Sequence, residues 1–374
     1  MTNILVTGIT GLVGSSFVAD LLKKDKSLKI TAIVRRQAKK NALKRVLEIV
    51  EEQYNFDDDS GYAEHALERI NVIEGDITQP GFLDNISLFK DVDTIFHCAA
   101  DVNLGKDPEG KTYRINYGGT TLVLELAKRL KVKTFHYVST AYVSGKTPGL
   151  VKEDELIASD FNNPYEKSKF EAEKLVRESG IPFTIYRPSI IVGRLADGKI
   201  RKPLAFYRIL EFMAKLKKHY CAKNKIDPAG WCEMPLRLHA ELSDKIYFVP
   251  IDYVQKAVTT IFLKPVCNRT YHITGNSPVS TAMIEEVVGE VLRLKGVTVQ
   301  PVIDDPTLDE KLVDRFIGDL LPYFSTQTVF DQTNVRDAVG DEALSWVIDK
   351  AQLKVLIGGY YKFFFPSIGW MQKL

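Results

Sequence analysis

The sequence predicts an α/β fold, in which a doubly wound parallel sheet is followed by a smaller, mainly helical C-terminal lobe. Two observations support this prediction. Short apolar runs alternate with stretches of helical periodicity along the first half of the chain, as in a parallel sheet covered by helices on both faces. A glycine-rich turn joins the first apolar run to a first helix near Val13 to Lys24, and doubly wound folds open in this way. The expected strands are Ile4–Val6, Lys29–Val34, Ile70–Glu74, Thr94–Cys98, Thr134–Ser139 and Phe183–Arg187.

Length and composition indicate a soluble protein with two lobes. The chain has 374 residues, of which 45% are hydrophobic and 26% charged, and this length suits one core sheet plus a second lobe. We expect residues 1–193 to form the core, with 246–275 returning to it, and residues 194–245 and 276–374 to form the other lobe. The net charge of +2 gives no reason to expect nucleic acid as a partner. Four cysteines without a C-x-x-C pair, and an N-terminus without a signal-peptide pattern, predict a cytoplasmic protein.

The turn Thr7–Gly14, with the sequence T-G-I-T-G-L-V-G, has the spacing of a dinucleotide-binding turn. Its first two glycines allow the backbone to turn tightly and to approach a pyrophosphate, whose charge then faces the N-terminus of the next helix. The third glycine allows this helix to pack closely on the sheet. A plain strand-to-helix turn is the alternative, but the position between a first strand and a first helix favours a nicotinamide cofactor. The residues expected at the cofactor are Gly8, Thr10, Gly11, Leu12, Val13 and Gly14.

The residues after the second strand predict which nicotinamide cofactor binds. Sites for NAD usually place an acidic residue there to bind the ribose, whereas this chain has Arg35 and Arg36 and no acid until Glu48. A guanidinium can bind a 2′-phosphate through two hydrogen bonds. NADPH is therefore favoured, with Arg35 as the first candidate and Arg36 and Arg45 close to it. The neighbouring lysines, for which a solvated helix face is the favoured interpretation, are Lys39, Lys40 and Lys44.

The third strand ends where the adenine is expected. Asp76 and Ile77 follow this strand and are expected at the adenine edge. A role as a turn or cap residue is the alternative for Asp76.

Two further segments predict a reactive centre. The fifth strand ends in Ser139-Thr140, and a helix that opens near Asn163 carries Tyr165 and Lys169 at i,i+4 spacing, which places both on one helix face. A neighbouring ammonium lowers the pKa of a tyrosine and makes it a better proton donor and acceptor near neutrality. The hydroxyl of Thr140, or alternatively that of Ser139, could orient a substrate carbonyl beside Tyr165. A half-exposed tyrosine above an ordinary lysine is the alternative, but the preceding nucleotide turn favours a reductase site.

These motifs resemble the extended short-chain dehydrogenase/reductase superfamily, and within it the thioester reductase and fatty acyl-CoA reductase branch. The resemblance spans residues 1 to about 275. The motifs that carry it are T-G-I-T-G-L-V-G, H-C-A-A-D-V-N at His97–Asn103, R-I-N-Y-G-G-T at Arg114–Thr120, Y-V-S-T-A-Y-V at Tyr137–Val143, N-P-Y-E-K-S-K at Asn163–Lys169, Y-R-P-S-I-I-V-G at Tyr186–Gly193 and F-V-P-I-D-Y-V at Phe248–Val254.

The resemblance implies roles for further residues and a reaction. The catalytic threonine, tyrosine and lysine of such enzymes correspond to Thr140, Tyr165 and Lys169, and the asparagine that organises the site corresponds to Asn116. The implied reaction is hydride transfer from NADPH to the carbonyl of an acyl thioester, which gives an aldehyde and a thiol, and a second round would give an alcohol. The acyl donor would be coenzyme A or an acyl carrier protein. The resemblance also implies that the residues lining the cofactor or lying beside the nicotinamide include Ala99, Ala100, Pro188 and Ser189.

The C-terminal part of the chain contains fewer motifs from which a function can be predicted. An apolar stripe at helical spacing is interpreted as packing in preference to a groove for a fatty chain. The lysine run from Lys215 to Lys225 is interpreted as a solvated face, with attraction of coenzyme A phosphates or an acidic carrier protein as the alternative. His219, Cys221, Cys232 and His239 match no familiar zinc spacing, so no metal is expected. The stripe consists of Phe206, Ile209, Leu210, Met213 and Leu216.

The segment Val355–Met371 is apolar and rich in aromatic residues. It is shorter than the roughly 20 residues that span a bilayer, and Lys362 and Pro366 interrupt it. Folding back over the C-terminal lobe is slightly favoured, and a peripheral membrane contact is the alternative.

Two other functions remain open at this point. The first is another reductase, dehydrogenase or epimerase of the same superfamily that acts on a ketone, sterol or nucleotide sugar. The second is a non-catalytic NADP-binding redox sensor. Sensors of this fold typically lose the tyrosine–lysine pair, and this chain keeps both residues, so the sensor is the least favoured.

Overall fold

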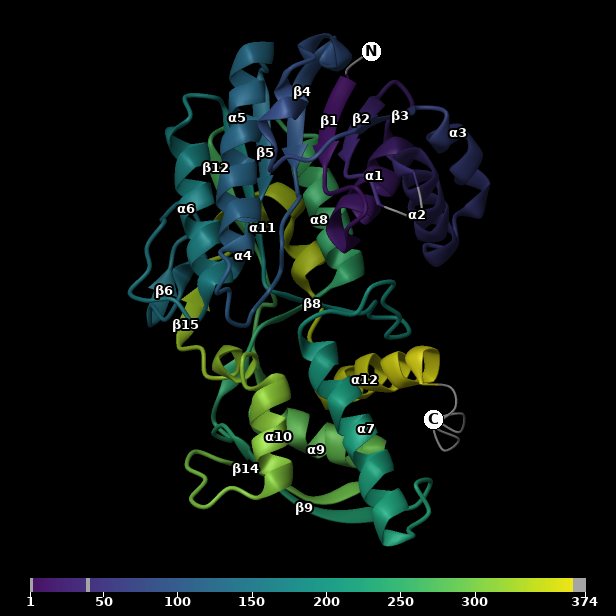
Figure 1. The fold of residues 1–374 in the computed structure, drawn as a ribbon, viewed down its shortest axis with the longest axis vertical. Coiled ribbons are helices and arrows are strands. Elements are labelled where there is room, and N and C mark those ends of the chain that lie inside the picture. The colour runs from purple at the N-terminus through teal and green to yellow at the C-terminus, as the bar shows by residue number, and fades with distance from the viewer. Residues whose placement is uncertain (1–2, 38–40, 366–374) are drawn as a thin grey trace. The chain divides into compact units, whose positions relative to one another are not determined.

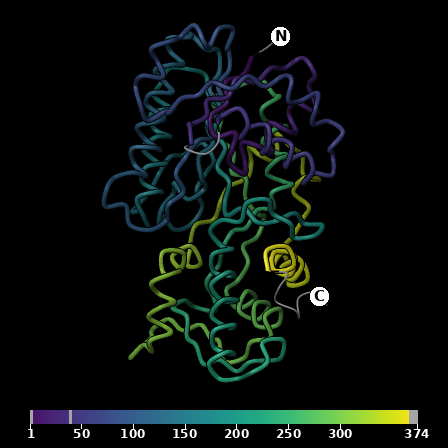
Figure 2. The backbone as a smooth tube through the Cα atoms, turned by 45° about the vertical axis from the view of Figure 1, so that its right-hand side comes forward, coloured from purple at the N-terminus to yellow at the C-terminus, as the bar shows by residue number. Residues whose placement is uncertain are grey.

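The computed structural model describes residues 3–37 and 41–365, which form two compact units (Figure 1). Unit 1 consists of Met1–Pro188, Tyr253–Ile273 and Phe330–Ala343, and unit 2 consists of Ser189–Asp252, Thr274–Val329 and Leu344–Leu374. The three stretches of each unit can be followed by colour in Figure 2. The expected boundaries at residues 193, 246 and 275 lie two to seven residues from those of the units, and residues 330–343, which were expected in the other lobe, belong to unit 1. There the helix α11 (Thr333–Val339) packs on a strand of unit 1, and the backbone amide of Asn334 donates to the buried carboxylate of Glu153.

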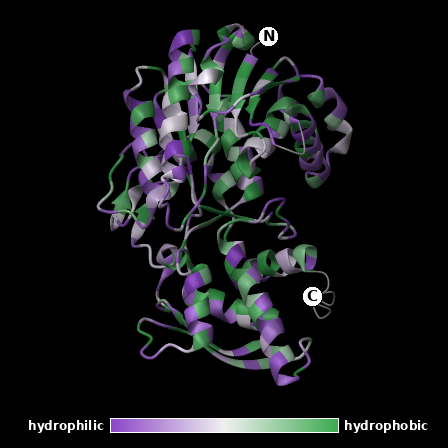
Figure 3. Ribbon diagram, viewed as in Figure 1, coloured by the Kyte–Doolittle hydropathy of each residue, from purple (hydrophilic) through white to green (hydrophobic). Residues whose placement is uncertain are grey.

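Unit 1 contains a seven-stranded parallel sheet in the order β12-β7-β5-β4-β1-β2-β3. This confirms the doubly wound fold. The apolar runs of the sequence form its strands, which appear green in Figure 3. The second and third strands have the expected bounds, four others differ by one or two residues at an end, and β12 was not among the expected strands. The strands are β1 (Asn3–Thr7), β2 (Lys29–Val34), β3 (Ile70–Glu74), β4 (Val92–His97), β5 (Thr134–Val138), β7 (Phe183–Pro188) and β12 (Arg269–Ile273).

Helices cover both faces of this sheet. On one face, α5 and α6 contribute Val123, Ala172 and Val176 to a buried apolar cluster that includes alternate residues of the strands. On the other face, Phe17 of α1 stacks on Phe96 of β4, with ring centroids 3.8 Å apart. The helices of unit 1 are α1 (Leu12–Lys24), α2 (Ala42–Phe56), α3 (Ala63–Leu67), α4 (Lys111–Tyr113), α5 (Gly119–Leu130), α6 (Pro164–Glu178), most of α8 (Ile251–Phe262), and α11.

Unit 2 is built mainly from helices around short strand pairs. The strands β9 (Cys232–His239) and β14 (Leu294–Gln300) pair in parallel. A cavity of about 260 Å³ in this unit is lined mostly by aliphatic and aromatic side chains, Ile209 and Met213 among them. The five residues of the apolar stripe are buried, as expected for packing. The helices are α7 (Phe206–Asn224), α9 (Thr281–Leu292), α10 (Leu308–Ile317) and α12 (Lys350–Phe364), and the remaining strands are β8 (Ile190–Val192), β10 (Lys245–Ile246), β11 (Phe248–Pro250) and β13 (Val279–Ser280).

One lysine of the run in α7 is not on a solvated face. Lys217 is fully buried and donates to the carbonyl oxygens of Gly230, at 3.0 Å, and Leu292, at 2.6 Å. The expectation of a solvated face is therefore wrong for Lys217, because two backbone carbonyls replace water around its ammonium group.

The described part of the segment Val355–Met371 lies in and directly after α12. Leu356, Ile357 and Tyr360 are buried, and the hydroxyl of Tyr361 donates to the carbonyl oxygen of Leu210 in α7. The rest of the segment lies outside the described residues. Among the residues that the structure describes, no helix is long and apolar enough to cross a membrane.

Candidate active site

The glycine turn forms a backbone cradle at the start of α1. Gly8 has a φ of +77°, and a Cβ atom there would lie 2.6 Å from the backbone nitrogen of Ala99, so only glycine fits. A Cβ atom at Gly14 would lie 2.3 Å from the carbonyl oxygen of Gly8. Leu12 is buried while Thr10 and Val13 are half-buried, and the first turn of α1 has neither a side-chain cap nor an acidic residue. These features fit a pyrophosphate, because its charge would face backbone N–H groups at a helix N-terminus.

The arginines expected at the 2′-phosphate lie together after β2. Arg35 and Arg36 are exposed. Arg45 reaches back from α2 and donates through Nη1 to the carbonyl oxygen of Arg35, at 2.6 Å. Glu74, at the end of β3, lies 3.7 Å from the Nε atom of Arg36. Lys39 and Lys40 lie outside the described residues.

Asp76 and Ile77 have structural contacts of their own. The Asp76 carboxylate accepts hydrogen bonds from the backbone amide and the hydroxyl of Thr78, at 2.9 and 2.8 Å, as in an Asx turn. The Ile77 side chain is buried, and a Cβ atom at Gly119 would lie 3.0 Å from its Cδ1 atom. The turn role that the sequence left open for Asp76 is therefore present, and Ile77 belongs to the core around α5.

A buried histidine organises the loop after β4, and the sequence analysis assigned it no role. The Thr7 hydroxyl lies 2.6 Å from His97 Nδ1, and the Thr120 hydroxyl lies 3.0 Å from His97 Nε2. The backbone amide of Ala99 donates to the Thr7 hydroxyl, and the Thr120 hydroxyl donates to the carbonyl oxygen of Asn116. These four hydrogen bonds are all satisfied when His97 is neutral and protonated on Nε2: Nε2 then donates to the Thr120 hydroxyl, and Nδ1 accepts from the Thr7 hydroxyl. Burial and the charge of Lys169 lower the pKa of His97 to about 3, which agrees with a neutral ring.

Asn116 joins two elements of the site. It lies in a π-helical turn, Arg114–Gly118, and such turns are frequent at functional sites. Its carbonyl oxygen accepts from the backbone amide of Asp101 at 2.8 Å, and its amide group donates to the hydroxyl of Ser168 at 2.9 Å. Asn116 therefore ties the loop after Ala99 and Ala100 to α6. Because Asn116 and Ser168 are far apart in the chain, only the fold shows this contact.

Tyr165 and Thr140 come together beside the end of β5. Asn163 caps α6 by accepting from the backbone amide of Glu166, and Pro164 occupies the first turn, so the helix begins directly before Tyr165. Burial and the charge of Glu166 raise the pKa of Tyr165, and a hydrogen bond with the Thr140 hydroxyl partly offsets this rise. Thr140 itself is buried and caps the short helical turn that follows it.

Lys169 lies one turn further along α6. It is only 2% exposed; its Nζ atom donates to the carbonyl oxygen of Val138 at 2.7 Å and lies 4.1 Å from the centroid of the Tyr137 ring. Burial lowers its pKa to about 7, against the opposing charges of Cys98 and Glu173. The i,i+4 spacing of Tyr165 and Lys169 predicted that the ammonium group lowers the pKa of the tyrosine. The structure differs, because burial has the largest effect on both groups.

Pro188 is the last residue of β7, and Ser189 follows it. The carbonyl oxygen of Pro188 accepts from the Thr140 hydroxyl at 3.4 Å, which places the end of β7 next to the end of β5. Ser189 is the first residue of unit 2 and its side chain is buried. Among the described residues, no group of three or more His, Cys, Asp or Glu side chains is placed to hold a metal ion.

A parallel seven-stranded sheet with a glycine cradle at its first helix has the Rossmann-like fold of the extended short-chain dehydrogenases/reductases, and Thr140, Tyr165 and Lys169 lie at the carboxyl edge of that sheet. The NAD-binding family described as male sterility protein matches residues 6–258, and the chain belongs to this family.

Known proteins resemble this chain over most of its length. It is 24% identical to the nonribosomal peptide synthetase asaC of Aspergillus flavus over 90% of the chain and 34% of that protein, and 29% identical to the L-2-aminoadipate reductase of Saccharomyces cerevisiae over 70% of the chain and 19% of that protein. The chain thus spans about a third or less of these relatives. The crystal structure of the terminal R domain from the myxalamid PKS-NRPS biosynthetic pathway superposes with a TM-score of 0.73 at 25% identity, covering 98% of this chain and 92% of that one.

Proposed function

We propose that this protein is an NADPH-dependent reductase of acyl thioesters, which it converts into an aldehyde and a free thiol. The observation that carries the proposal is the position of α6: Lys169, one turn after Tyr165, donates to the carbonyl oxygen of Val138, two residues before Thr140, at the same carboxyl edge of the sheet that carries the glycine cradle. The relatives named as peptide synthetases and the R domain support a thioester substrate in preference to a ketone, sterol or nucleotide sugar.

The arginines after β2 support NADPH over NADH. Arg35 and Arg36 are exposed, and Arg45 holds the backbone that carries them. The guanidinium groups favour a 2′-phosphate, which a carboxylate at this place would repel. Glu74 beside Arg36 makes Arg35 the stronger candidate for the phosphate.

The side chains have separable roles in the chemistry. The bound cofactor would supply a hydride to the thioester carbonyl carbon. As that carbon becomes tetrahedral, its oxygen gains negative charge, and Tyr165 and Thr140 are placed to stabilise this charge by donating hydrogen bonds. The raised pKa of Tyr165 keeps its hydroxyl protonated near neutral pH, as a hydrogen-bond donor must be. Collapse of the tetrahedral species breaks the carbon–sulfur bond, re-forms the carbonyl as an aldehyde, and releases the sulfur as a thiolate that takes up a proton.

Asn116 and Lys169 would position these groups. Asn116 holds Ser168, whose hydroxyl donates to the carbonyl oxygen of Tyr165, so the asparagine restrains the first turn of α6. Lys169 is held by the Val138 carbonyl and would contact the nicotinamide ribose. Ala99, Ala100, Pro188 and Ser189 would line the cofactor.

A coupled assay tests the proposal. The purified chain is mixed with NADPH and a panel of acyl-CoAs of different chain length, or with the same acyl groups on a carrier protein, while NADPH absorbance and free thiol are recorded together. We expect one thiol released for the first NADPH oxidised, and the ratio of aldehyde to alcohol then counts the hydride transfers. NADPH oxidation without thiol release would contradict the thioester reaction, and turnover of a ketone or sugar instead would favour the other members of the superfamily.

A further inference from the structure

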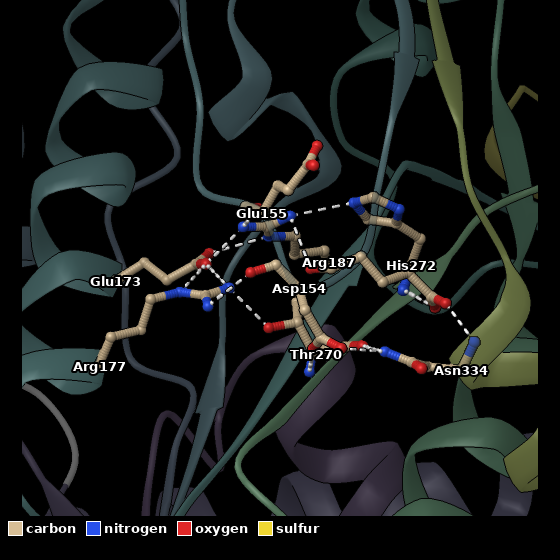
Figure 4. A network of polar contacts seen from close by, with 9 residues as sticks. Asp154, Glu155, Glu173, Arg177, Arg187, Thr270, His272 and Asn334 are labelled. Carbon is tan, nitrogen blue, oxygen red and sulfur yellow. Dashed lines mark hydrogen bonds and ion pairs between the residues drawn. The ribbon is translucent and has the colours of Figure 1, made fainter.

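The face of α6 that carries the catalytic residues continues into a buried ion pair. Tyr165, Lys169 and Glu173 follow each other at i, i+4 and i+8, so they lie on one face of the helix. Glu173 is fully buried, and its carboxylate faces Arg187 of β7, the residue directly before Pro188 (Figure 4). No part of the proposed chemistry uses either residue. Their location between α6 and the end of β7 nevertheless links the helix to the edge of the sheet.

The Glu173–Arg187 contact has the geometry of a strong, specific pair. The Nε atom of Arg187 donates to one carboxylate oxygen at 3.1 Å, and Nη2 donates to the other at 2.6 Å. This two-point contact fixes distance and angle together. Burial alone would raise the pKa of Glu173, but the charges of Arg187 and Arg177 outweigh it and hold the pKa at about 2. The carboxylate is therefore ionised at neutral pH.

All five N–H groups of Arg187 have acceptors. Besides the two bonds to Glu173, Nη1 donates to the carbonyl oxygen of Glu153 at 3.3 Å and to His272 Nε2 at 3.1 Å, and Nη2 donates to the carbonyl oxygen of Glu155 at 2.8 Å. His272 can accept because its Nδ1 donates to the carbonyl oxygen of Asp331. Such a fully bonded guanidinium cannot rotate or shift without losing several hydrogen bonds at once.

A second arginine holds the same carboxylate from the helix itself. Arg177 donates twice to Glu173, and its Nη2 atom donates to the hydroxyl of Thr270 in β12 at 2.7 Å. Glu173 is thus tied to β7 directly and to β12 through Arg177, and Figure 4 shows the three side chains converging. The middle of α6 is held at a set distance from two strands of the sheet.

We propose that Glu173 and Arg187 are positioning residues, which set the place of Tyr165 and Lys169 relative to Thr140 by locking α6 to the carboxyl end of β7. Thr140 is itself attached to this end of β7, because its hydroxyl donates a hydrogen bond to the carbonyl oxygen of Pro188, the residue after Arg187. A displacement of about 1 Å at a reacting group can lower turnover by about 100-fold while the ligand still binds. The pair thereby serves catalysis without touching the substrate or the cofactor.

The test separates positioning from stability. Removing Glu173 alone would leave a buried, uncompensated arginine and could unfold the protein, so the main variant replaces both charges by apolar groups, Glu173→Leu with Arg187→Met. We expect this double variant to melt near the native temperature, to bind NADPH within about 2-fold of the native Kd, and to lose kcat by about 10- to 100-fold. Glu178→Gln is the matched control, because Glu178 forms an exposed ion pair with Lys174 on the same helix, and it should leave the melting temperature, the Kd and kcat unchanged. A stable double variant with native kcat would overturn the proposal.

If the double variant does not fold, Glu173→Asp decides the question. It keeps the charge but shortens the side chain by one methylene, so the helix must move or the contact must lengthen. We expect kcat to fall while the KM for NADPH stays within about 2-fold, since the cradle at the glycine turn is untouched. Native kcat in a folded Glu173→Asp variant would overturn the proposal.

The inference rests on the proposed function only through the choice of substrate. If the native protein turns over a ketone or sugar instead of a thioester, the same variants are compared with that substrate. A substrate-free arm measures the pKa of Lys169 by NMR with labelled lysine. The groups that act on this pKa are Cys98, Glu173 and the buried surroundings, including Tyr137, His97 and the Val138 carbonyl. Loss of the Glu173 charge should lower the Lys169 pKa below about 7. An unchanged Lys169 pKa in a folded Glu173→Gln variant, which removes only the negative charge, would contradict the link between the two residues.

Discussion

Replacement of Tyr165 by phenylalanine removes one hydroxyl and leaves the ring in place. The hydroxyl is hydrogen-bonded to that of Thr140, and one hydrogen bond contributes about 1 kcal/mol to stability, so the melting temperature should change little. A general acid contributes about 10²- to 10⁴-fold to turnover. Its loss therefore corresponds to about 3–5 kcal/mol of transition-state stabilisation. The expected result is a kcat lower by this factor and a Kd for NADPH within about 2-fold of the native value, because the glycine cradle and Lys169 remain.

The assay is NADPH oxidation with the best acyl thioester of the panel, and NADPH binding is measured separately by fluorescence. Tyr54→Phe is the control variant, because the hydroxyl of Tyr54 also makes a hydrogen bond, to the carbonyl oxygen of Ala19 at 2.9 Å, and Tyr54 lies outside the proposed site. The control should lose a similar stability and keep its kcat. A near-native kcat for Tyr165→Phe would refute the role of Tyr165 as proton or hydrogen-bond donor. A loss of equal size in the control would show that the effect arises from stability.

Three further predictions concern the cofactor site and the buried histidines. Arg35→Asp should raise the Kd for NADPH by at least about 10-fold and leave the Kd for NADH nearly unchanged, since charge repulsion acts only on the 2′-phosphate. Equal increases of both Kd values in a binding titration would contradict binding of the 2′-phosphate by Arg35. Gly14→Ala should abolish NADPH binding or folding, because its Cβ atom would lie 2.3 Å from a backbone oxygen of the turn, and normal binding by calorimetry would contradict the cradle. Burial lowers the pKa of His97, His136 and His272 from 6.5 to about 3 each, so the unfolded chain binds more protons below pH 6.5 and stability falls as pH falls. The three rings together should lower the stability by about 3 kcal/mol between pH 6.5 and 5.5, and Glu153, whose pKa burial raises to about 8, offsets part of this loss. A net loss should still be visible in urea melts, and equal stability at both pH values would contradict neutral buried rings.

The sequence by itself determined the elements of the sheet and the residue types of the site. The apolar runs of β1 to β5 and of β7 are short and rich in β-branched residues, and their alternation with helical periodicity predicts a parallel sheet without any tertiary information. Local motifs likewise locate Gly8, Gly14, Tyr165 and Lys169, because each depends on spacing within one turn or one helix. The family motifs added Thr140 and Asn116.

Only the tertiary structure decided the contacts between distant segments. The partners of His97 lie on β1 and α5, and Glu173 meets Arg187 only because α6 packs beside β7. No local pattern specifies such pairs. Buried polar groups are nearly always hydrogen-bonded, but the sequence does not predict which group each of them contacts. Burial is a tertiary property for the same reason. The sequence predicted that Lys169 would lower the pKa of Tyr165, whereas desolvation has the largest effect on both groups, raising the pKa of Tyr165 and lowering that of Lys169.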